Sequence, residues 1–262
     1  MTSARRFRDL HEHDLFVMPN AWDVGSARLL EQLGFAAIAT TSSGFAATLG
    51  RSDQHVRREE LLSHVDSLVT AVNVPVSVDA ENCYPTEPGG VARSVELLAA
   101  AGAAGLSIED YDPGSGLLPI DAASDRVAEA VTAASRHDVV ITARAENYLY
   151  RVKDLADTVD RLLAYRDAGA DVLYAPGLAA IADIEHVVGQ VEAPLNVLTV
   201  AGGPAIPELA RAGVRRISTG GSLAWVAYGA LVTAARELLE QGTTSYLAAG
   251  LDQATRAAAF GD

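Results

Sequence analysis

Cysteine is almost absent from this chain of 262 residues, since Cys83 is the only one. A single cysteine excludes an internal disulfide and any metal site built from several thiolates, and it fits a reducing compartment. No histidine lies near Cys83 in the sequence, which favours a bystander over a nucleophile. Residues 1–13 are charged and do not resemble a signal peptide, and no run is long and apolar enough for a membrane helix. We therefore expect a cytoplasmic protein without a membrane partner.

Basic residues are also scarce. The chain has 20 Lys and Arg against 34 Asp and Glu, which gives a formal net charge of −14. This charge argues against nucleic acid or an anionic membrane as a partner. The only lysine, Lys153, is expected at a helix start, which argues against a Schiff-base aldolase. None of the six histidines follows an expected strand, which argues against a zinc site or a histidine general base.

Aromatic residues make up only 6% of the chain, whereas 49% is hydrophobic and consists mostly of Ala, Val and Leu. Eight strand-like runs occur, each followed by a helical pattern such as that of residues 56–72. These runs are continuously apolar rather than alternating, which indicates a parallel sheet buried on both faces. They span residues 16–19, 36–41, 74–79, 105–109, 139–143, 172–175, 194–198 and 214–218.

A weak internal repeat supports this arrangement. Four of the runs are preceded by a glycine at the point where a helix should end, namely Gly34, Gly102, Gly169 and Gly213. Eight such units predict a single α/β domain over residues 1–262, a (β/α)8 TIM barrel. An open doubly wound sheet is the alternative, but no Gly-x-Gly-x-x-Gly follows the first strand. Two extra helices, over residues 223–241 and 244–260, follow the last strand, and this segment of residues 222–262 is expected to pack on a partner subunit.

Charged side chains follow three of the expected strands. Asp79 and Glu81 follow the third strand, Glu109 the fourth and Arg144 the fifth. In a barrel these positions meet at one face, where active sites lie. Hard oxygen ligands suit Mg²⁺ or Mn²⁺, and Arg144 would neutralise a substrate carboxylate or a developing enolate. A structural ion cluster is the alternative, and the recurrence on several strands favours a functional site.

Two further stretches have competing interpretations. Residues 218–222 are glycine-rich and follow the last strand, where barrels often bind phosphate, but an ordinary helix start is favoured. Trp22 is expected to be a packing residue, with Asp23 opening the following helix.

Several motifs together resemble one known family, the isocitrate lyase/phosphoenolpyruvate mutase superfamily. The resemblance covers residues 15–220 and implies a TIM barrel that exchanges its last helix within a homo-oligomer. It also implies magnesium and a 2-oxo acid or hydroxy-carboxylate substrate that passes through an enolate-like intermediate. The motifs are Pro19-Asn20-Ala21-Trp22-Asp23, Ser42-Ser43-Gly44, Leu49-Gly50 with Asp53, Val78-Asp79-Ala80-Glu81, Ile108-Glu109-Asp110 and Ala143-Arg144.

The resemblance also implies residue roles. Asp79 resembles the direct metal ligand, and the water-linked carboxylates would be Asp53, Glu81 and Glu109. The residues that would bind the substrate are Trp22, Ser43, Gly44, Phe45, Arg144 and Asn196. Arg144 and Glu109 are also candidate catalytic residues.

The chain departs from its relatives in the lid that follows the fourth strand. Residues 112–117 contain neither the Lys-Lys-Cys-Gly-His loop of the lyases nor the Lys and Asn of the mutases and phosphonopyruvate hydrolases. Glu81 also replaces the usual aspartate. The favoured hypothesis is a magnesium-dependent lyase or decarboxylase of a small 2-oxo dicarboxylate such as oxaloacetate, with water or Tyr111 as proton donor. The alternatives are a C–P hydrolase or mutase, a non-catalytic barrel that binds a 2-oxo acid, and a phosphate-handling barrel.

Overall fold

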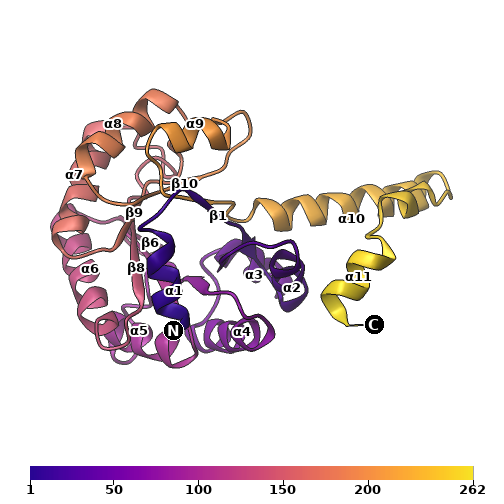
Figure 1. Cartoon of the computed structure of the whole chain (residues 1–262), viewed down its shortest axis with the longest axis horizontal. Helices are drawn as coiled ribbons and strands as arrows, with labels where there is room; N and C mark the ends of the chain where they lie inside the picture. Colours follow the sequence, from indigo (N-terminus) through magenta and orange to yellow (C-terminus); the bar gives the residue numbers. More distant parts are fainter. Residues whose placement is uncertain (262) are drawn as a thin grey trace.

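Parallel strands form a closed barrel surrounded by helices (Figure 1). The computed structural model describes residues 1–261. The strands follow one another around the barrel in the order β1, β11, β10, β9, β8, β5, β4, β3 and β2. Their bounds are β1 Phe16–Met18, β2 Asn20–Ala21, β3 Ile38–Thr40, β4 Val76–Asp79, β5 Gly105–Glu109, β8 Val140–Arg144, β9 Val172–Tyr174, β10 Leu195–Leu198 and β11 Arg216–Ser218. The predicted TIM barrel is confirmed.

Pro19 divides the first strand into two segments. β1 pairs with β11, and β2 pairs with β3 on the other side. Proline has no N–H to donate to a ladder, but its carbonyl accepts a hydrogen bond from the Ala39 N–H at 2.9 Å. The nine segments therefore correspond to the eight predicted strands, and the first strand closes the barrel.

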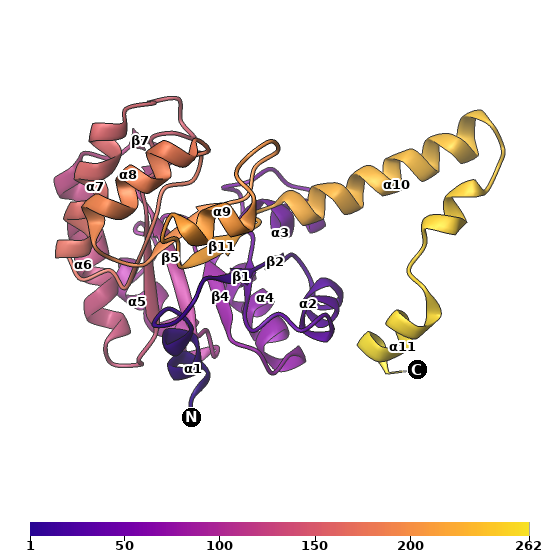
Figure 2. The ribbon, with the colours of Figure 1, turned by 45° about the horizontal axis from the view of Figure 1, so that its top comes forward.

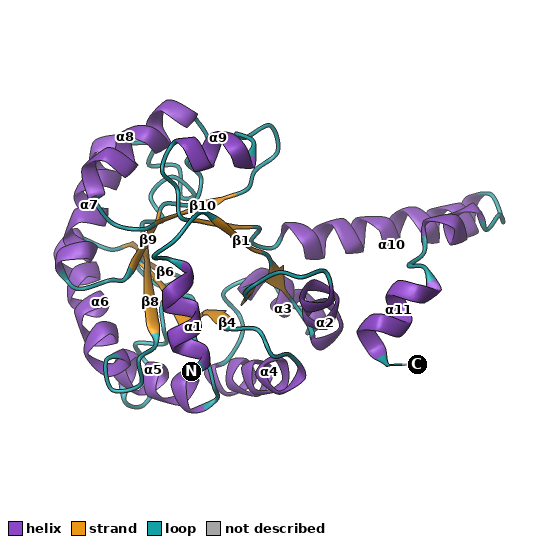
Figure 3. Ribbon diagram, in the orientation of Figure 1, coloured by secondary structure: helices purple, strands orange, loops and turns teal. Residues whose placement is uncertain are grey.

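Helices cover the outside of the barrel (Figure 3). The glycines predicted to end helices do so, since Gly34, Gly102, Gly169 and Gly213 all have positive φ angles, which glycine adopts without strain. The helices on the barrel are α1 Ser3–Leu10, α2 Val24–Gln32, α3 Ser42–Thr48, α4 Arg58–Ala71, α5 Gly90–Ala100, α6 Ile120–Ala134, α7 Leu155–Asp167, α8 Ile181–Val191 and α9 Ile206–Arg211. A short antiparallel hairpin, β6 Tyr111–Asp112 and β7 Gly116–Leu117, follows β5.

Helix α1 closes the N-terminal end of the barrel. Its Phe7 is fully buried against Ala104, Val140 and Val172, which lie at or beside strand starts. The imidazole of His11 packs edge-on against the Phe7 ring, with the ring centroids 4.8 Å apart. Ligands can therefore enter only from the opposite end, where the strands finish.

The C-terminal helices leave the barrel (Figure 2). Helix α10, Ser222–Glu240, buries only Ala224, and the short 3-10 helix Ser245–Ala249 follows it. Helix α11, Gln253–Phe260, returns to contact α2. Within residues 1–261, no helix combines the length and the apolar character needed to cross a membrane.

Candidate active site at the carboxyl ends of the strands

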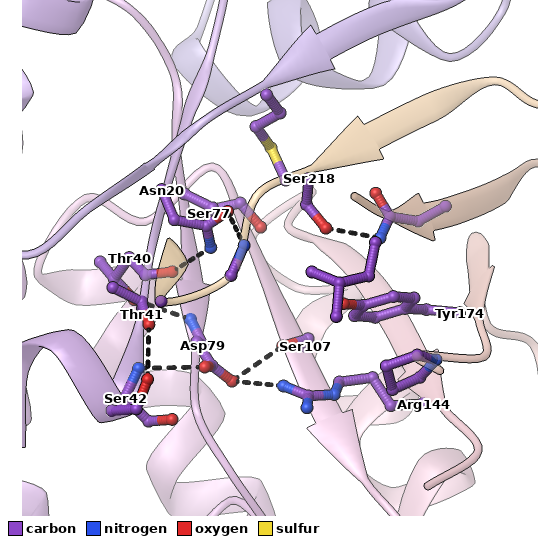
Figure 4. A pocket seen from close by; sticks show the side chains of 18 of the residues that line it. Asn20, Thr40, Thr41, Ser42, Ser77, Asp79, Ser107, Arg144, Tyr174 and Ser218 are labelled. Carbon is purple, nitrogen blue, oxygen red and sulfur yellow. Dashed lines mark hydrogen bonds and ion pairs between the residues drawn. The ribbon is translucent and has the colours of Figure 1, made fainter. Parts of the chain in front are cut away.

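Asp79 lies at the centre of a cavity that opens at the carboxyl ends of the strands (Figure 4). One carboxylate oxygen accepts a hydrogen bond from the Ser42 N–H at 3.0 Å, and the other lies 3.4 Å from the Ser107 hydroxyl. The Thr40 hydroxyl accepts a hydrogen bond from the Asp79 backbone N–H at 2.8 Å. These contacts from β3, α3 and β5 hold the carboxylate toward the cavity.

Arg144 pairs with three carboxylates. Its guanidinium lies 2.7 Å from an oxygen of Asp79, 2.7 Å from one of Glu146 and 3.4 Å from one of Glu109. Burial alone would lower the pKa of Arg144, but these carboxylates raise it well above its usual value. Burial raises the pKa of Glu109 in spite of the arginine. The arginine is therefore a fixed cation in an environment with excess acid.

Two more carboxyl groups, those of Asp53 and Glu81, are influenced by the charge of Asp79. Burial and then the charge of Asp79 raise the pKa of Asp53, which also lines the cavity. The same two causes, with Asp53 as a third, raise the pKa of Glu81 to about 8. A bound cation would relieve this repulsion, and carboxylate and hydroxyl oxygens are the donors that Mg²⁺ or Mn²⁺ prefers. The donor set therefore fits a hard divalent cation.

The four predicted metal-binding carboxylates do not share one point. In the part of the chain that the structure describes, no three His, Cys, Asp or Glu side chains converge as a metal cluster. Asp79 and Asp53 face the main cavity, whereas Glu81 lines a smaller neighbouring cavity. Gln54 connects the other two, because its N–H donates to Glu81 at 3.2 Å and its side-chain amide donates to Glu109 at 2.6 Å. Glu81 and Glu109 thus do not line the main cavity into which Asp79 projects.

The predicted substrate-binding loop is divided between two cavities. Ser43 lines the main cavity, and its hydroxyl lies 3.3 Å from that of Thr41. Phe45 and Trp22 line a separate surface pocket, in which the Phe45 ring stacks on His64 with the centroids 3.8 Å apart. Only Ser43 and its backbone are therefore placed to contact a ligand beside Asp79.

Tyr111, the predicted proton donor, begins the hairpin and does not line the main cavity. Its ring stacks on that of Tyr150, with the centroids 3.5 Å apart. Inside the cavity, the phenol of Tyr174 lies beside Arg144, whose guanidinium carbon is 5.3 Å from the ring centroid. Burial raises the pKa of Tyr174 to about 12, so this phenol is protonated at neutral pH.

The glycine-rich stretch after β11 already has an intramolecular partner. The Asn20 side-chain oxygen accepts hydrogen bonds from the N–H groups of Thr219 and Gly220, each at 2.9 Å. These amides are therefore occupied by the protein, which argues against a phosphate cradle. Asp23 opens α2 as predicted, since its side chain accepts from the Ser26 N–H at 2.7 Å.

Three residues in or beside the cavity had no role assigned from the sequence. Glu146 binds Arg144 from outside the cavity lining, Tyr174 contributes a phenol, and Arg216 is buried in the barrel interior. Asn196, which was predicted, connects to this interior group: its amide donates to Ser218 at 2.9 Å and its oxygen accepts from Arg216 at 2.8 Å. The period-two alternation of β11 would have indicated that Arg216 and Ser218 face inward together.

Comparisons with known proteins identify the family. A family model described as phosphoenolpyruvate phosphomutase matches residues 7–239. Oxaloacetate decarboxylase from Paraburkholderia xenovorans (strain LB400) is 32% identical over 228 residues, which cover 82% of this chain and 74% of that protein. A crystal structure from Burkholderia cenocepacia J2315, assigned only in general terms as a lyase/mutase, is 44% identical, with a TM-score of 0.91 over 96% of this chain and 93% of that one.

A second structural relative is oxaloacetate acetylhydrolase in complex with the product oxalate. It is 25% identical, with a TM-score of 0.87, and the match covers 98% of this chain and 94% of that one. The predicted superfamily and the predicted type of enzyme, a lyase or mutase, are confirmed. The chain belongs to the phosphoenolpyruvate phosphomutase family, within the phosphoenolpyruvate mutase/isocitrate lyase superfamily.

Proposed function

We propose that the protein is a magnesium-dependent lyase or decarboxylase that cleaves a C–C bond of a small 2-oxo dicarboxylate such as oxaloacetate. The observation that carries this proposal is the pairing of Asp79 with Arg144 at 2.7 Å in one cavity. The carboxylate of Asp79, which can bind a cation, thus lies beside the guanidinium of Arg144, which can bind an anion. Two relatives named for reactions of oxaloacetate, the decarboxylase and the acetylhydrolase, support the choice of substrate.

The cation would be held by Asp79, with Asp53 linked to it through water, since both side chains face the cavity. When bound, Mg²⁺ supplies a Lewis acid that draws electron density from the 2-oxo group. Manganese has the same oxygen preference and is expected to substitute for it. Glu81 and Glu109 are both bound by Gln54, and burial raises the pKa of each. A cation bound at Asp79 would favour the charged form of these two carboxyl groups.

Arg144 orients the substrate and stabilises the enolate that remains after bond cleavage. Its guanidinium is fixed by Glu146 and Glu109, so that little reorganisation is needed when negative charge develops. Ser43 can bind a carboxylate through its hydroxyl and its backbone N–H. The hydroxyl lies near that of Thr41, and no hydrogen bond within residues 1–261 uses the N–H. Gly44 allows this loop to pack closely against Trp22 and Ala224.

The proton that completes the reaction can come from water, from the predicted Tyr111 or from Tyr174. Tyr174 is a protonated phenol in the cavity beside Arg144, whereas Tyr111 lies in the stacked hairpin outside it. This placement favours Tyr174 for a substrate bound at Asp79. Tyr111 would act only after the hairpin had moved.

A C–P hydrolase or mutase is the second candidate, because the matching family model is that of phosphoenolpyruvate phosphomutase. The lid lacks the lysine and asparagine that this chemistry was expected to need. Phosphonopyruvate therefore belongs in the same assay as oxaloacetate. Tight binding of oxalate without turnover of either substrate would indicate the non-catalytic alternative.

The test is a steady-state assay of oxaloacetate and phosphonopyruvate with and without Mg²⁺. We expect metal-dependent loss of oxaloacetate, and a decrease in kcat/KM of about 100-fold or more in Asp79→Asn. Asp66→Asn, which makes the same change at an exposed position on α4, should leave the rate unchanged. Failure of oxaloacetate to react in the presence of Mg²⁺, or full activity of Asp79→Asn, would count against the proposal.

A further inference from the structure

The interior of the barrel is polar below Asp79, where a TIM barrel usually packs branched apolar side chains. The walls of the cavity there are small residues, and its floor contains a buried arginine, Arg216. The cavity, of about 730 Å³ including its open mouth, therefore continues past the Asp79–Arg144 pair into the barrel. Its inner part is lined by Met18, Ala39, Ser77, Ser107, Asn196, Arg216 and Ser218.

Arg216 is 2% exposed, and its described partners are all neutral. Its guanidinium donates to the Asn196 side-chain oxygen at 2.8 Å and to the Thr142 hydroxyl at 2.9 Å. Its third contact is His11 Nε2 at 3.1 Å. His11 Nδ1 lies 2.9 Å from the Phe7 carbonyl and donates to it, so Nε2 is the acceptor of a neutral imidazole.

No carboxylate in residues 1–261 forms an ion pair with Arg216, whereas Arg144 in the same cavity has three. Burial of a charge without a counter-ion costs several kcal/mol. In agreement with this, burial lowers the pKa of Arg216 to about 9. The guanidinium remains charged at neutral pH, so the floor of the cavity is positive while its mouth, at Asp79 and Asp53, is negative.

We propose that Arg216 is the specificity-determining residue that receives the distal carboxylate of the substrate at the floor of the barrel. The inference rests on the proposed function and assigns the residue that would recognise the second carboxylate of the substrate. The 2-oxo end would lie at Asp79 and Arg144, and the distal carboxylate would supply the counter-ion that Arg216 lacks. Three of the five N–H groups of the guanidinium have a partner, and the other two are available to a carboxylate.

The experiment compares two ligands that differ by one carboxylate, malate and lactate, by calorimetry in the presence of Mg²⁺. Neither carries the 2-oxo group on which the proposed reaction depends, and product analysis of the same samples establishes that binding is measured without turnover. Wild-type protein should bind malate about tenfold or more tightly than lactate, because a charge-assisted hydrogen bond contributes about 1.5–3 kcal/mol. In Arg216→Gln this preference should disappear while the affinity for lactate is retained.

Arg215→Gln is the matched control, because it removes the same charge from the adjacent, exposed residue. It should keep the preference for malate. Ser77→Val provides a second test that leaves Arg216 unchanged, since Ser77 forms part of the inner wall and a larger side chain would obstruct the path to the floor. It should also lose the preference. Thermal unfolding of each variant establishes that it is folded.

Three results would overturn the inference: equal affinities in the wild type, no binding of malate by the wild type, or an unchanged preference in a folded Arg216→Gln or Ser77→Val. The proposed reaction is tested separately by turnover of oxaloacetate and by Asp79→Asn. A preference for malate without turnover of oxaloacetate would support the carboxylate site at Arg216 and contradict the proposed reaction.

Discussion

Gly44 has almost no free space around its α-carbon. A Cβ atom there would lie 2.6 Å from Thr41 Cγ2, 2.9 Å from Trp22 Cβ and 3.3 Å from Ala224 Cβ. The loop that carries Ser43 thus packs closely between Trp22, which follows β2, and Ala224 near the start of α10. The glycine of the Ser42-Ser43-Gly44 motif serves close packing rather than an unusual φ angle.

Gly44→Ala should therefore displace the loop. We expect a loss of about 1–3 kcal/mol in the free energy of unfolding, because the neighbours include Cβ atoms that cannot move without their backbones. Urea unfolding measures this change, and kcat/KM should decrease as Ser43 moves. Gly189→Ala in α8 is the control: a Cβ there meets nothing within 4 Å, so the variant should gain up to about 1 kcal/mol. Equal stability of both variants would contradict the packing argument.

Two buried histidines make the stability of the protein dependent on pH. Burial lowers the pKa of His11 to about 3 and that of His64 to about 4, so both are neutral in the folded chain. An unfolded histidine titrates near 6.5 and binds a proton below that pH, so stability decreases as the pH falls from about 6.5 toward the folded pKa. Each histidine should cost about 2 kcal/mol at pH 5.

The measurement is urea unfolding at pH 7.5 and pH 5 for the wild type and for His64→Gln. The variant should show the smaller loss between the two pH values. His186→Gln, on the exposed side of α8, should behave as the wild type does. A loss in His64→Gln as large as that of the wild type would show that His64 is protonated in the fold.

At this scale the sequence predicted the side chains that sit at strand ends but not those deeper in the barrel. Asp79 and Arg144 could be located because each ends an apolar run. Arg216 begins its strand. Whether it lines a cavity depends on how much space the side chains of the other strands leave inside the barrel, which no single strand pattern shows. The positions of Glu81 and Glu109 behind Gln54 depend on loop geometry, which strand patterns do not determine.

At the scale of elements, the hairpin β6–β7 is attached to the barrel by a buried network centred on Asp110. One oxygen of Asp110 accepts from the Tyr165 hydroxyl at 2.5 Å and from Arg161 at 2.9 Å. Arg161 also donates to the Leu118 carbonyl at 2.8 Å, at the far end of the hairpin. The network thereby joins α7 to the lid in which the chain departs from its relatives.

Tyr165→Phe should destabilise this attachment. Loss of one partner of a buried carboxylate is expected to cost about 1–3 kcal/mol and to speed amide hydrogen exchange in residues 111–118. Tyr228→Phe on α10, where no hydrogen bond of the hydroxyl is found in the described chain, serves as the control. Unchanged exchange in the hairpin of Tyr165→Phe would show that Asp110 does not hold it.

The elements themselves could be predicted well, because a parallel barrel gives each strand a continuous apolar run and each helix a clear end. The hairpin could not, since its two strands contain two residues each and have no apolar period. Residues 244–260 were predicted as one helix, but the structure contains a 3-10 turn and a separate α11 there. Gly250 and the Asp252 cap divide that segment.

At the scale of the whole molecule, α10 exposes large apolar side chains along its length. Trp225, Val226, Leu231 and Leu239 are between 54% and 87% exposed. Such a surface is unfavourable in water unless another chain covers it. The predicted homo-oligomer, with α10 packed on a partner subunit, would remove it.

We expect size-exclusion chromatography with light scattering to show an oligomer for the wild type. Val226→Glu combined with Leu231→Glu should shift it toward the monomer, because each adds a charge to the apolar surface. Arg236→Glu, an exposed polar position on the same helix, should leave the assembly intact. A monomeric wild type would contradict the prediction.

The pairing of β1 with β11, the first strand segment with the last strand, has a consequence for how the chain folds during synthesis. Phe16 pairs with Arg216, so the ladder that closes the barrel joins residues 200 positions apart. Such a contact is the costliest in chain entropy and cannot form until the ribosome has released β11. Until then β1 and β10 remain unpaired edges, open to aggregation. The nascent chain should therefore depend on chaperones until its last strand has emerged.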